Sequence, residues 1–448
     1  MKRLLFLLTL ALPVLLSPLA GHSQEKWDLR RCVDYAVANN ISVKQSDVQA
    51  RLAKLTLDQS RLSQIPTLIG SLSGSVNAGH TQDPITYQLN TYTSYYSTPQ
   101  LQSNVNVYNF SSLRNAIEAN RLSWEAALAG SDKTKNDLTL NVANAYLQVL
   151  MAIEQTQASE LQLHFSQSNL TLTRKQVNAG TLPELNAAEL EAQVAQDSAT
   201  YINSKGNIDL NILTLKAYMG MDAATPFDVA TPPIEDIPVE SIADLQPDIV
   251  YALALGSQPL QKMDSFQIAA ARSNVASAKG ARWPTFSVFG QLSSSFVKST
   301  QYESKGYFQQ FDDNFAQFLG VGINIPILNN GVLRTNYAKS KLNLLNNQLQ
   351  RDQDNLTLKQ NVYQAYTAAM TALQKFQANK ISVAATQKSF LYAQKRYDVG
   401  MLNTIDLLTN QNNFFNARVN LLTSQFDYVF KMKVLEFYKG LGVKLTKE

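Results

Sequence analysis

The residues that could carry chemistry in this chain of 448 residues are few and widely separated. The single cysteine, Cys32, excludes an intrachain disulfide, and packing within a helix explains it better than reactivity does. The three histidines are too scattered in sequence to suggest a metal site: His22, His80 and His164. We therefore expect no resident metal and no cofactor.

Catalytic motifs are missing as well. The chain holds no GxSxG, HExxH, P-loop or GxGxxG sequence, which are patterns typical of hydrolases, zinc proteases and nucleotide-binding enzymes. Asp352 and Asp354 lie two positions apart in an expected helix, so their carboxylates would point to different faces. Asp312 and Asp313 are too few acidic residues to indicate a calcium site, and a solvated loop explains them better. The sequence therefore favours a protein that is not an enzyme.

The composition indicates a surface that meets water without much charge. Charged residues make up 17% of the chain, compared with about 25% in ordinary soluble proteins. Ser, Thr, Asn, Gln and Ala take their place. The formal net charge is only +4, which gives no reason to expect nucleic acid as a partner.

Residues 1–23 have the pattern of a secretory signal peptide. Lys2 and Arg3 precede an apolar run from Leu4 to Leu16, and small residues follow it. The run is shorter than the ~20 apolar residues that a spanning helix needs. Cys32 lies beyond the cleavage region without a lipobox, so we expect no lipid anchor. A secreted chain without membrane helices can still enter an outer membrane as a β-barrel.

The strongest structural signal is an internal repeat with an offset of 220 residues. Identical residues recur in one register: Leu113, Asn141, Ala145, Tyr146, Gly180, Leu215, Tyr218 and Gly220 match Leu333, Asn361, Ala365, Tyr366, Gly400, Leu435, Tyr438 and Gly440. We predict a first repeat at 24–220, a second repeat at 247–440 and a tail at 441–448. The proline-rich segment 221–246 between them is expected to be a linker or strap and not a core element.

Each repeat is expected to begin with a helix that proline ends. These helices cover about 42–63 and 259–281. The pattern then alternates with a period of two, which is typical of strands, in two segments per repeat. The apolar positions are Leu68, Leu72 and Val76, then Val105, Val107 and Tyr108, and in the second repeat Phe286, Val288 and Leu292, then Leu319, Val321, Ile323 and Ile325. Polar, tyrosine-rich loops are expected at 80–100 and 300–314.

Very long helices are expected after the strands. Segments 112–178 and 332–398 contain no proline, and at ~1.5 Å per residue each would be about 100 Å long. Gly180 and Gly400 then break them, and shorter helices return to about 219 and 439. The long helices have only a narrow apolar stripe, for example Leu138, Val142, Ala145, Val149 and Ala152.

Four strands in one chain cannot form a closed membrane barrel alone. In lipid every strand edge must be paired, and small membrane barrels begin at about eight strands. Two copies would supply eight strands and three would supply twelve, and the sequence by itself does not choose between them. The small and neutral polar residues of the long helices are compatible with a wet tunnel, whereas a plain coiled-coil stalk would not need the strands.

The order of these elements, with two local motifs, resembles the outer-membrane efflux protein family (TolC-like) over about 27–440. Residues Trp27 to Ala36 look like the family's N-terminal helix, and the segment Tyr397 to Met401, followed by Asp406, looks like its helix–turn–helix tip. The resemblance implies a mainly α-helical fold with a membrane β-barrel contribution. Long hairpins would form a periplasmic tunnel, and the strands would close as a 12-stranded barrel in a homotrimer within the outer membrane.

The resemblance also implies partners. A periplasmic adaptor and an inner-membrane pump would deliver substrate to a passive exit duct for efflux or type I secretion, and the barrel would contact outer-membrane lipid. The hairpin tips that contact the adaptor correspond to Gly180, Thr181 and Leu182, and to Val399, Gly400, Met401 and Leu402.

A periplasmic gate is implied near the second tip. Tyr397 and Asp406 match family positions that hold the closed aperture together, and Asn186 is the first-repeat counterpart of Asp406. Leu402 and Thr409 stand where a well-known member of the family has an arginine and a second aspartate. This implies that the gate is held by fewer charges or by other residues. A ring of Asp406 carboxylates would attract cations, or alternatively Asp406 caps the returning helix.

Two other classes of protein compete with the duct. A structural coiled-coil protein of the envelope would have neither a barrel nor conductance. A diffusion porin should supply eight or more strands per chain and no long helices, so it ranks last.

Overall fold

The computed structural model describes residues 26–82, 87–234, 237–300 and 303–441. The predicted signal peptide lies outside these residues, as does the predicted tail apart from its first residue. The chain forms two compact units. The first contains the described residues up to Ile41, Lys135–Val250 and those from Val362 onward, and the second contains Ser42–Thr134 and Tyr251–Asn361. Each unit takes residues from both sequence repeats, because the two long helices pass from one unit into the other.

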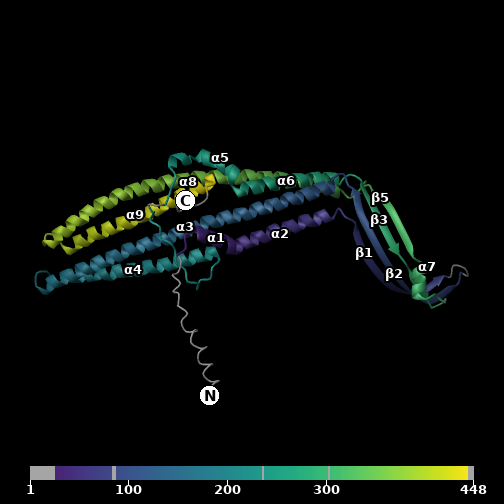
Figure 1. Ribbon diagram of the computed structural model, residues 1–448, viewed down its shortest axis with the longest axis horizontal. Coiled ribbons are helices and arrows are strands. Elements are labelled where there is room, and N and C mark those ends of the chain that lie inside the picture. The colour runs from purple at the N-terminus through teal and green to yellow at the C-terminus, as the bar shows by residue number, and fades with distance from the viewer. Residues whose placement is uncertain (1–25, 83–86, 235–236, 301–302, 442–448) are drawn as a thin grey trace, which may run out of the picture. The chain divides into compact units, whose positions relative to one another are not determined.

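The second unit combines helices with an antiparallel sheet (Figure 1). Its elements include most of α2 (Ile41–Leu62), α6 (Pro259–Gly280), β1 (Thr67–Gln82), β2 (Leu89–Tyr108), β3 (Thr285–Ser293), β4 (Phe296–Ser299), α7 (Tyr307–Asp313) and β5 (Ala316–Asn324). Pro66 and Pro284 stand directly before β1 and β3. Proline has no N–H for a strand ladder, so it is suited to the position before the first paired residue.

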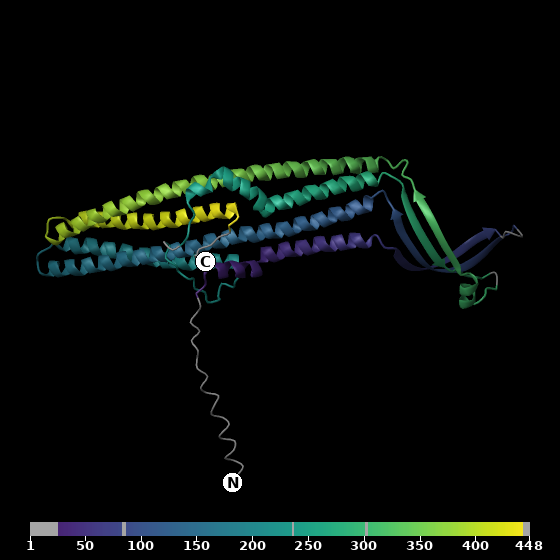
Figure 2. The same cartoon turned by 45° about the horizontal axis from the view of Figure 1, so that its top comes forward.

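The strand order in the sheet is β1-β2-β3-β5, and the short β4 pairs with part of β2. All neighbouring strands are antiparallel. Among the described residues β1 pairs only with β2, and β5 pairs only with β3, so these two strands form the edges of the sheet. The strands curve together in both views (Figures 1 and 2).

The expectation of four strands joined by two loops is wrong in detail. Strand β2 begins at Leu89, so most of the expected loop at 80–100 is strand. The expected loop at 300–314 contains α7, and β4 is a fifth strand. Tyr and Thr fit a pleated strand well, but a strand in which both faces are polar lacks the apolar alternation by which sequence reveals strands.

Two helical hairpins make up most of the first unit, which receives the C-terminal parts of the long helices (Figures 1 and 2). The long helix α3 (Ser112–Asn178) turns back as α4 (Glu184–Met219), and α8 (Val332–Asp398) turns back as α9 (Thr404–Lys439). Both long helices contain 67 residues and both returning helices contain 36. The repeat of 220 residues is therefore also a repeat of helix boundaries.

The apolar stripe predicted along the first long helix is buried at all five positions: Leu138, Val142, Ala145, Val149 and Ala152. Beside it, Tyr146 is buried and its hydroxyl donates to the carbonyl oxygen of Ala230 at 2.6 Å. Helix α1 (Leu29–Asn39) adds Cys32 and Ala36 to the buried residues. A narrow apolar stripe is enough to pack the helix, because each helix contacts its neighbours along one side.

The segment 221–246, called the strap below, is more than a linker. Its Val229 forms a parallel bridge with Trp27, and Val229, Ile237 and Leu245 are buried. The expectation that it is not a core element is therefore wrong. Its prolines interrupt regular structure, of which the described part keeps the short 3₁₀ helix Ile242–Leu245. The apolar side chains between the prolines are still buried.

The junction between α6 and the start of α3 is tight. A Cβ atom at Gly280 would lie 2.8 Å from the carbonyl oxygen of Phe110 and 3.0 Å from the amide nitrogen of Ser112, so no larger residue fits. Phe110 and Ser111 have φ of 47° and 62°, in the left-handed region. This strained turn lies where strand β2 passes into the long helix.

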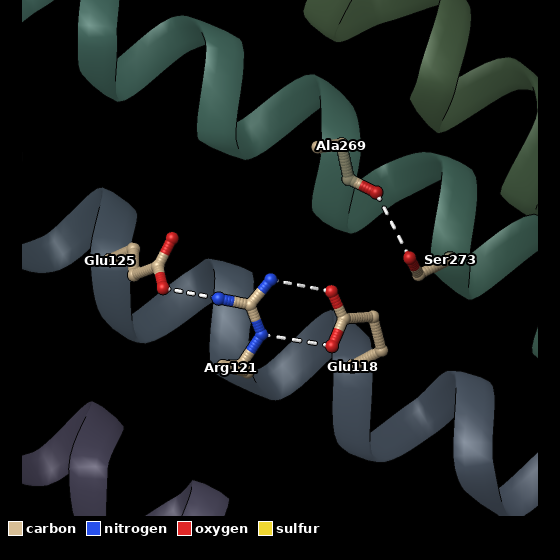
Figure 3. A network of polar contacts seen from close by, with 5 residues as sticks. All are labelled: Glu118, Arg121, Glu125, Ala269 and Ser273. Carbon is tan, nitrogen blue, oxygen red and sulfur yellow. Dashed lines mark hydrogen bonds and ion pairs between the residues drawn. The ribbon is translucent and has the colours of Figure 1, made fainter.

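Several charged side chains on the long helices pair with neighbours on the same helix. Figure 3 shows Arg121 between Glu118 and Glu125, and its Nε donates to Glu118 at 2.9 Å. The hydrogen bond from Arg121 holds the pKa of Glu118 below its usual value. On α6, Ser273 donates to the carbonyl oxygen of Ala269 at 3.2 Å. Such exposed pairs contribute little stability, but they keep the polar helix faces satisfied locally.

Candidate functional site

The sheet has one apolar and one polar face. Residues directly opposite each other in an antiparallel pair share a face, and neighbours along a strand alternate, so the register assigns every residue. The apolar face carries Leu68, Leu72, Val76, Leu101, Val105, Val288, Leu292, Leu319, Val321 and Ile323. The polar face carries Thr67, Ser71, Ser73, Ser75, Asn77, Gln100, Gln102, Asn104, Ser287 and Gln291. Three apolar residues also lie on this face: Ile69, Phe289 and Phe318.

The polar face is neutral. Strands β1, β2, β3 and β5 contain no Asp, Glu, Lys or Arg. Hydroxyl and amide side chains can hydrogen-bond water without selecting strongly for the sign of an ion. A face of this kind suits a wet lumen, and the opposite face suits lipid.

Aromatic rings gather where the sheet meets the helices of the second unit. The ring centroids of Tyr108 and Phe110 lie 4.9 Å apart, and those of Phe110 and Trp283 lie 5.4 Å apart. Phe286 lies 6.0 Å from Tyr108. Tyr and Trp are enriched at membrane–water boundaries, so this cluster is suited to one edge of a membrane.

In the first unit, the two hairpins end in the same turn. Gly180 and Gly400 both have φ of 74°. The glycine amide bonds to the carbonyl three residues back at 2.8 Å in the first tip and 2.9 Å in the second, and the next amide bonds five residues back at 3.0 and 2.7 Å. This is the Schellman arrangement, which satisfies the last helix carbonyls and needs a left-handed residue.

Apolar side chains are exposed at both tips. Val399 and Met401 are 67% and 70% exposed. Leu185 and Ile405, which lie 220 positions apart, are 65% and 60% exposed in the first turns of the returning helices. Leu402 instead packs against a buried cluster. Exposed apolar residues at the tips of both hairpins indicate a surface that contacts another protein.

The predicted gate residues lie in different environments, Tyr397 and Asp406 near the second tip and Asn186 near the first. Tyr397 is buried, and its hydroxyl oxygen lies 3.1 Å from the hydroxyl oxygen of Thr173, so it joins α8 to α3 within one chain. Asp406 is exposed in the first turn of α9, where the cap hydrogen bond comes from Asn403, which accepts from the amide of Asp406 at 2.7 Å. Asn186 is half-buried in the corresponding turn of α4.

Farther along the hairpins lies a buried polar cluster. The carboxylate of Asp197 is 3% exposed and accepts from Gln162 at 2.8 Å, Gln193 at 2.9 Å and Ser166 at 2.6 Å. Gln411 of α9 donates to Ser166 at 2.8 Å, which connects the two hairpins. Neutral donors thus satisfy this buried carboxylate.

The sequence alone did not point to two groups of residues here. It did not single out Leu185 and Ile405, although both are apolar at the same repeat position in a polar turn. It also missed Asp197 and its donors. The sequence did hold one indication of this cluster, since its polar residues occupy helix positions that continue an apolar stripe. It does not show which of these polar side chains form hydrogen bonds with one another.

Comparison with known proteins connects these features. Residues 32–221 and 250–431, which are most of the chain, match the family described as outer membrane efflux protein. The chain belongs to the outer membrane efflux protein family. As a member of that family it is an outer-membrane protein.

Individual relatives are distant in sequence. TolC of Salmonella enteritidis is 22% identical over 311 residues, which are 68% of this chain and 61% of TolC, so this chain spans about three fifths of that relative. The probable efflux pump outer membrane protein TtgC of Pseudomonas putida is 23% identical over 357 residues, covering 78% of this chain and 69% of TtgC. Both relatives are named as outer membrane proteins, and TtgC is named as a probable efflux pump component.

Solved structures share the fold of this outer membrane efflux protein. A structure of CusC superposes with a TM-score of 0.79 at 19% identity, covering 93% of this chain and 92% of that one. The Campylobacter jejuni channel CmeC gives a TM-score of 0.76 at 18% identity, with coverage of 94% and 87%.

Cys32 and the histidine and acidic side chains are the other candidates for chemistry in this outer membrane efflux protein. Burial, and secondarily the charge of Asp28, raises the pKa of the Cys32 thiol to about 12, so it stays protonated. In the described part of the chain no group of three or more His, Cys, Asp or Glu side chains could hold a metal ion. Among the described helices, none has the length and apolar character required to cross a bilayer.

Proposed function

We propose that this outer membrane efflux protein is one subunit of a passive exit duct formed by three copies. The observation that supports this most strongly is the sheet with one apolar face, one neutral polar face and two edge strands. Open edges are not tolerated in lipid. Strand β4, with 4 residues, is too short to cross a membrane that needs about 9–11 residues per strand. Each copy would therefore supply four crossing strands, and the family resemblance implies that three copies close a barrel of twelve.

The polar faces of the strands would line the barrel, and the helices would continue the duct into the periplasm. In this proposal residues 1–23 direct export. The repeats at 24–220 and 247–440 each supply two crossing strands and one hairpin, and the strap at 221–246 connects them. The duct carries no cofactor and performs no reaction of its own.

Partners would meet the duct at the hairpin tips. The exposed apolar side chains of Leu185, Val399, Met401 and Ile405 suit the apolar residues of a periplasmic adaptor. The turns at Gly180–Leu182 and Val399–Leu402 would then be adaptor contacts, and an inner-membrane pump would supply the energy. The alkaline protease secretion protein AprF and the efflux protein TtgC are both relatives, so efflux and type I secretion are both open roles.

The gate would lie near the second tip. Three copies of the exposed Asp406 carboxylate, which the helix cap does not use, would form a ring that attracts cations. Tyr397 and Asn186 would hold the neighbouring helix turns in place. The alternative function is a structural coiled-coil protein of the envelope, but such a protein would need no sheet with separate apolar and polar faces.

Planar-bilayer conductance of the purified protein tests the proposal. We expect a small, cation-preferring conductance that increases in Asp406→Ala, because removal of the carboxylate ring loosens the gate. Asp209→Ala, which removes an exposed carboxylate farther along α4, is the matched control and should leave the conductance unchanged.

The possible results test the duct and the position of its gate separately. Unchanged conductance in Asp406→Ala would keep the duct and place the gate elsewhere. No conductance from any of the three folded proteins would overturn the duct and favour the structural protein.

A further inference from the structure

A groove of about 430 Å³ lies on the apolar face of the sheet. Its floor comes from the first third of β1, the middle of β2 and the end of β3. It includes Gly70, Leu72, Leu101 and Leu292, which the register places on the apolar face. Phe311 of α7 and Phe315 just after it complete the lining. A hollow with these walls accepts hydrocarbon and offers little to a polar ligand.

The segment around α7 is fixed over this face by polar contacts to the ends of β3 and β4. Ser294 donates from its hydroxyl to the carbonyl oxygen of Phe311 at 2.7 Å. The side-chain amide of Gln310 accepts from the amide of Val297 and donates to its carbonyl oxygen, both at 3.0 Å. The phenylalanine side chains of this segment stay exposed to another partner: Phe308 is 84% exposed, Phe311 41% and Phe315 46%.

Side-chain chemistry changes in a regular order along this face. Strand β4 places Phe296 opposite Ser97 and Lys298 opposite Tyr95, and these pairs lie on the same face as the groove. Tyr95 precedes Pro99, a lining residue, by four positions, which is about 13 Å of strand. The ring of Phe296 lies 4.8 Å from that of Tyr307. An apolar groove, then an aromatic pair, then an exposed cation follow one another away from the helices.

The order of apolar groove, aromatic pair and cation fits a bound lipid better than a bound protein. Acyl chains, the aromatic boundary and charged headgroups follow one another in the same sequence across one leaflet. A second copy of this chain would join at the edges of β1 and β5, which leaves the apolar face uncovered. The exposed ammonium of Lys298 suits a phosphate.

We propose that this groove binds an acyl chain of a phosphorylated, anionic lipid, whose headgroup pairs with Lys298. The inference rests on the proposed function only in that it assigns the apolar face of the sheet to the membrane. One such lipid would bind per chain, at the outer end of the sheet.

Native mass spectrometry of the detergent-purified protein tests this site. The protein is titrated with phosphatidylglycerol or with phosphatidylcholine that has the same acyl chains. We expect the wild type to bind one phosphatidylglycerol per chain, at least fivefold more tightly than phosphatidylcholine. Lys298→Gln should abolish this preference but keep binding, whereas Lys44→Gln on α2 should behave as the wild type.

Two glycines allow a matched test of the groove itself. A Cβ at Gly70 would lie 3.8 Å from Leu101, and a Cβ at Gly74 would lie 3.9 Å from the carbonyl oxygen of Tyr96, so both positions accept a side chain. Gly70→Leu should fill the groove and weaken binding of both lipids at least fivefold. Gly74→Leu lies on the same strand and face outside the lining and should have no effect.

The bilayer conductance of each variant shows whether the barrel is intact, so failure of the lipid site is distinguishable from failure of the duct. Equal effects of the two leucine variants, or no preference for phosphatidylglycerol in the wild type, would show that only non-specific annular lipid binds and would overturn the proposal.

Discussion

Asp264 of α6 is a residue whose charge conflicts with its surroundings. Its side chain is 2% exposed, and Oδ2 has no hydrogen-bond partner among the described residues. Burial, with a smaller effect from the charge of Asp354, raises its pKa to about 6, although Arg351 opposes the shift. The folded protein therefore binds this proton more tightly than the unfolded chain, whose aspartate pKa is about 3.9.

The free energy of unfolding should reflect this difference. The contribution of Asp264 is favourable at low pH and is lost as the pH rises from about 4 to about 6, where the group ionises in the folded state. At pH 7.5 its burial costs up to about 3 kcal/mol. Asp264→Asn should therefore raise the thermal unfolding midpoint at pH 7.5 and leave it unchanged at pH 4.

The exposed Asp209 provides the control, since Asp209→Asn should not shift the midpoint at either pH. If Asp264→Asn raised the midpoint equally at pH 4 and pH 7.5, the effect would come from packing and not from ionisation.

At the scale of elements, buried charges attach the strap to the ends of both returning helices. Lys216 donates from Nζ to the carbonyl oxygens of Ala223 at 2.9 Å and Thr225 at 2.7 Å. Glu436 holds the equivalent position in the second repeat, and it accepts from the amide of Glu240 at 2.9 Å. The two repeats thus use opposite charges at one position, because one end of the strap offers carbonyls and the other an amide.

Loss of the Lys216 ammonium should release the first part of the strap. Hydrogen bonds to charged groups contribute about 1.5–3 kcal/mol each, so Lys216→Met should speed proteolytic cleavage within 221–234 about tenfold or more. Limited proteolysis with mass spectrometry measures this. Lys205→Met, an exposed lysine on the same helix, should not change the cleavage rate, and equal cleavage in both variants would contradict a clamp at Lys216.

At the scale of the whole molecule, the two faces of the sheet should respond differently to the same change. Gln291 lies on the polar face and Val288 on the apolar face of β3. Gln291→Lys would place a positive charge in the proposed lumen, so it should shift the conductance away from cations. Val288→Lys would place the charge in lipid at a cost of about 2–4 kcal/mol near the midplane, so it should reduce insertion instead. Bilayer recordings and the fraction of protein recovered in the outer membrane measure the two effects.

The opposite pair of results would exchange the roles assigned to the two faces of the sheet. If Val288→Lys altered ion preference while Gln291→Lys prevented insertion, the apolar face would line the interior and the proposed barrel would be wrong.

The sequence by itself determined the features that depend on a few neighbouring residues. Proline before β1 and β3, glycine at both tips and the repeat of 220 positions placed the helix boundaries within a few residues. Alternation assigned the apolar positions of the strands, because a period of two puts them on one face whatever the partner strand is. The family resemblance rested on the order of the same elements.

Only the tertiary structure decided the contacts between distant parts of the chain. The full length of β2 depends on pairing with β1, the buried Val229 depends on the bridge to Trp27, and Tyr397 depends on Thr173 for its hydroxyl partner. The donors to Asp197 come from two helices, α3 and α4, and Gln411 of α9 donates in turn to Ser166. Polar residues have no periodic signature that names their partners, because a hydrogen bond needs specific atoms within about 3 Å, and that proximity is a property of the folded chain.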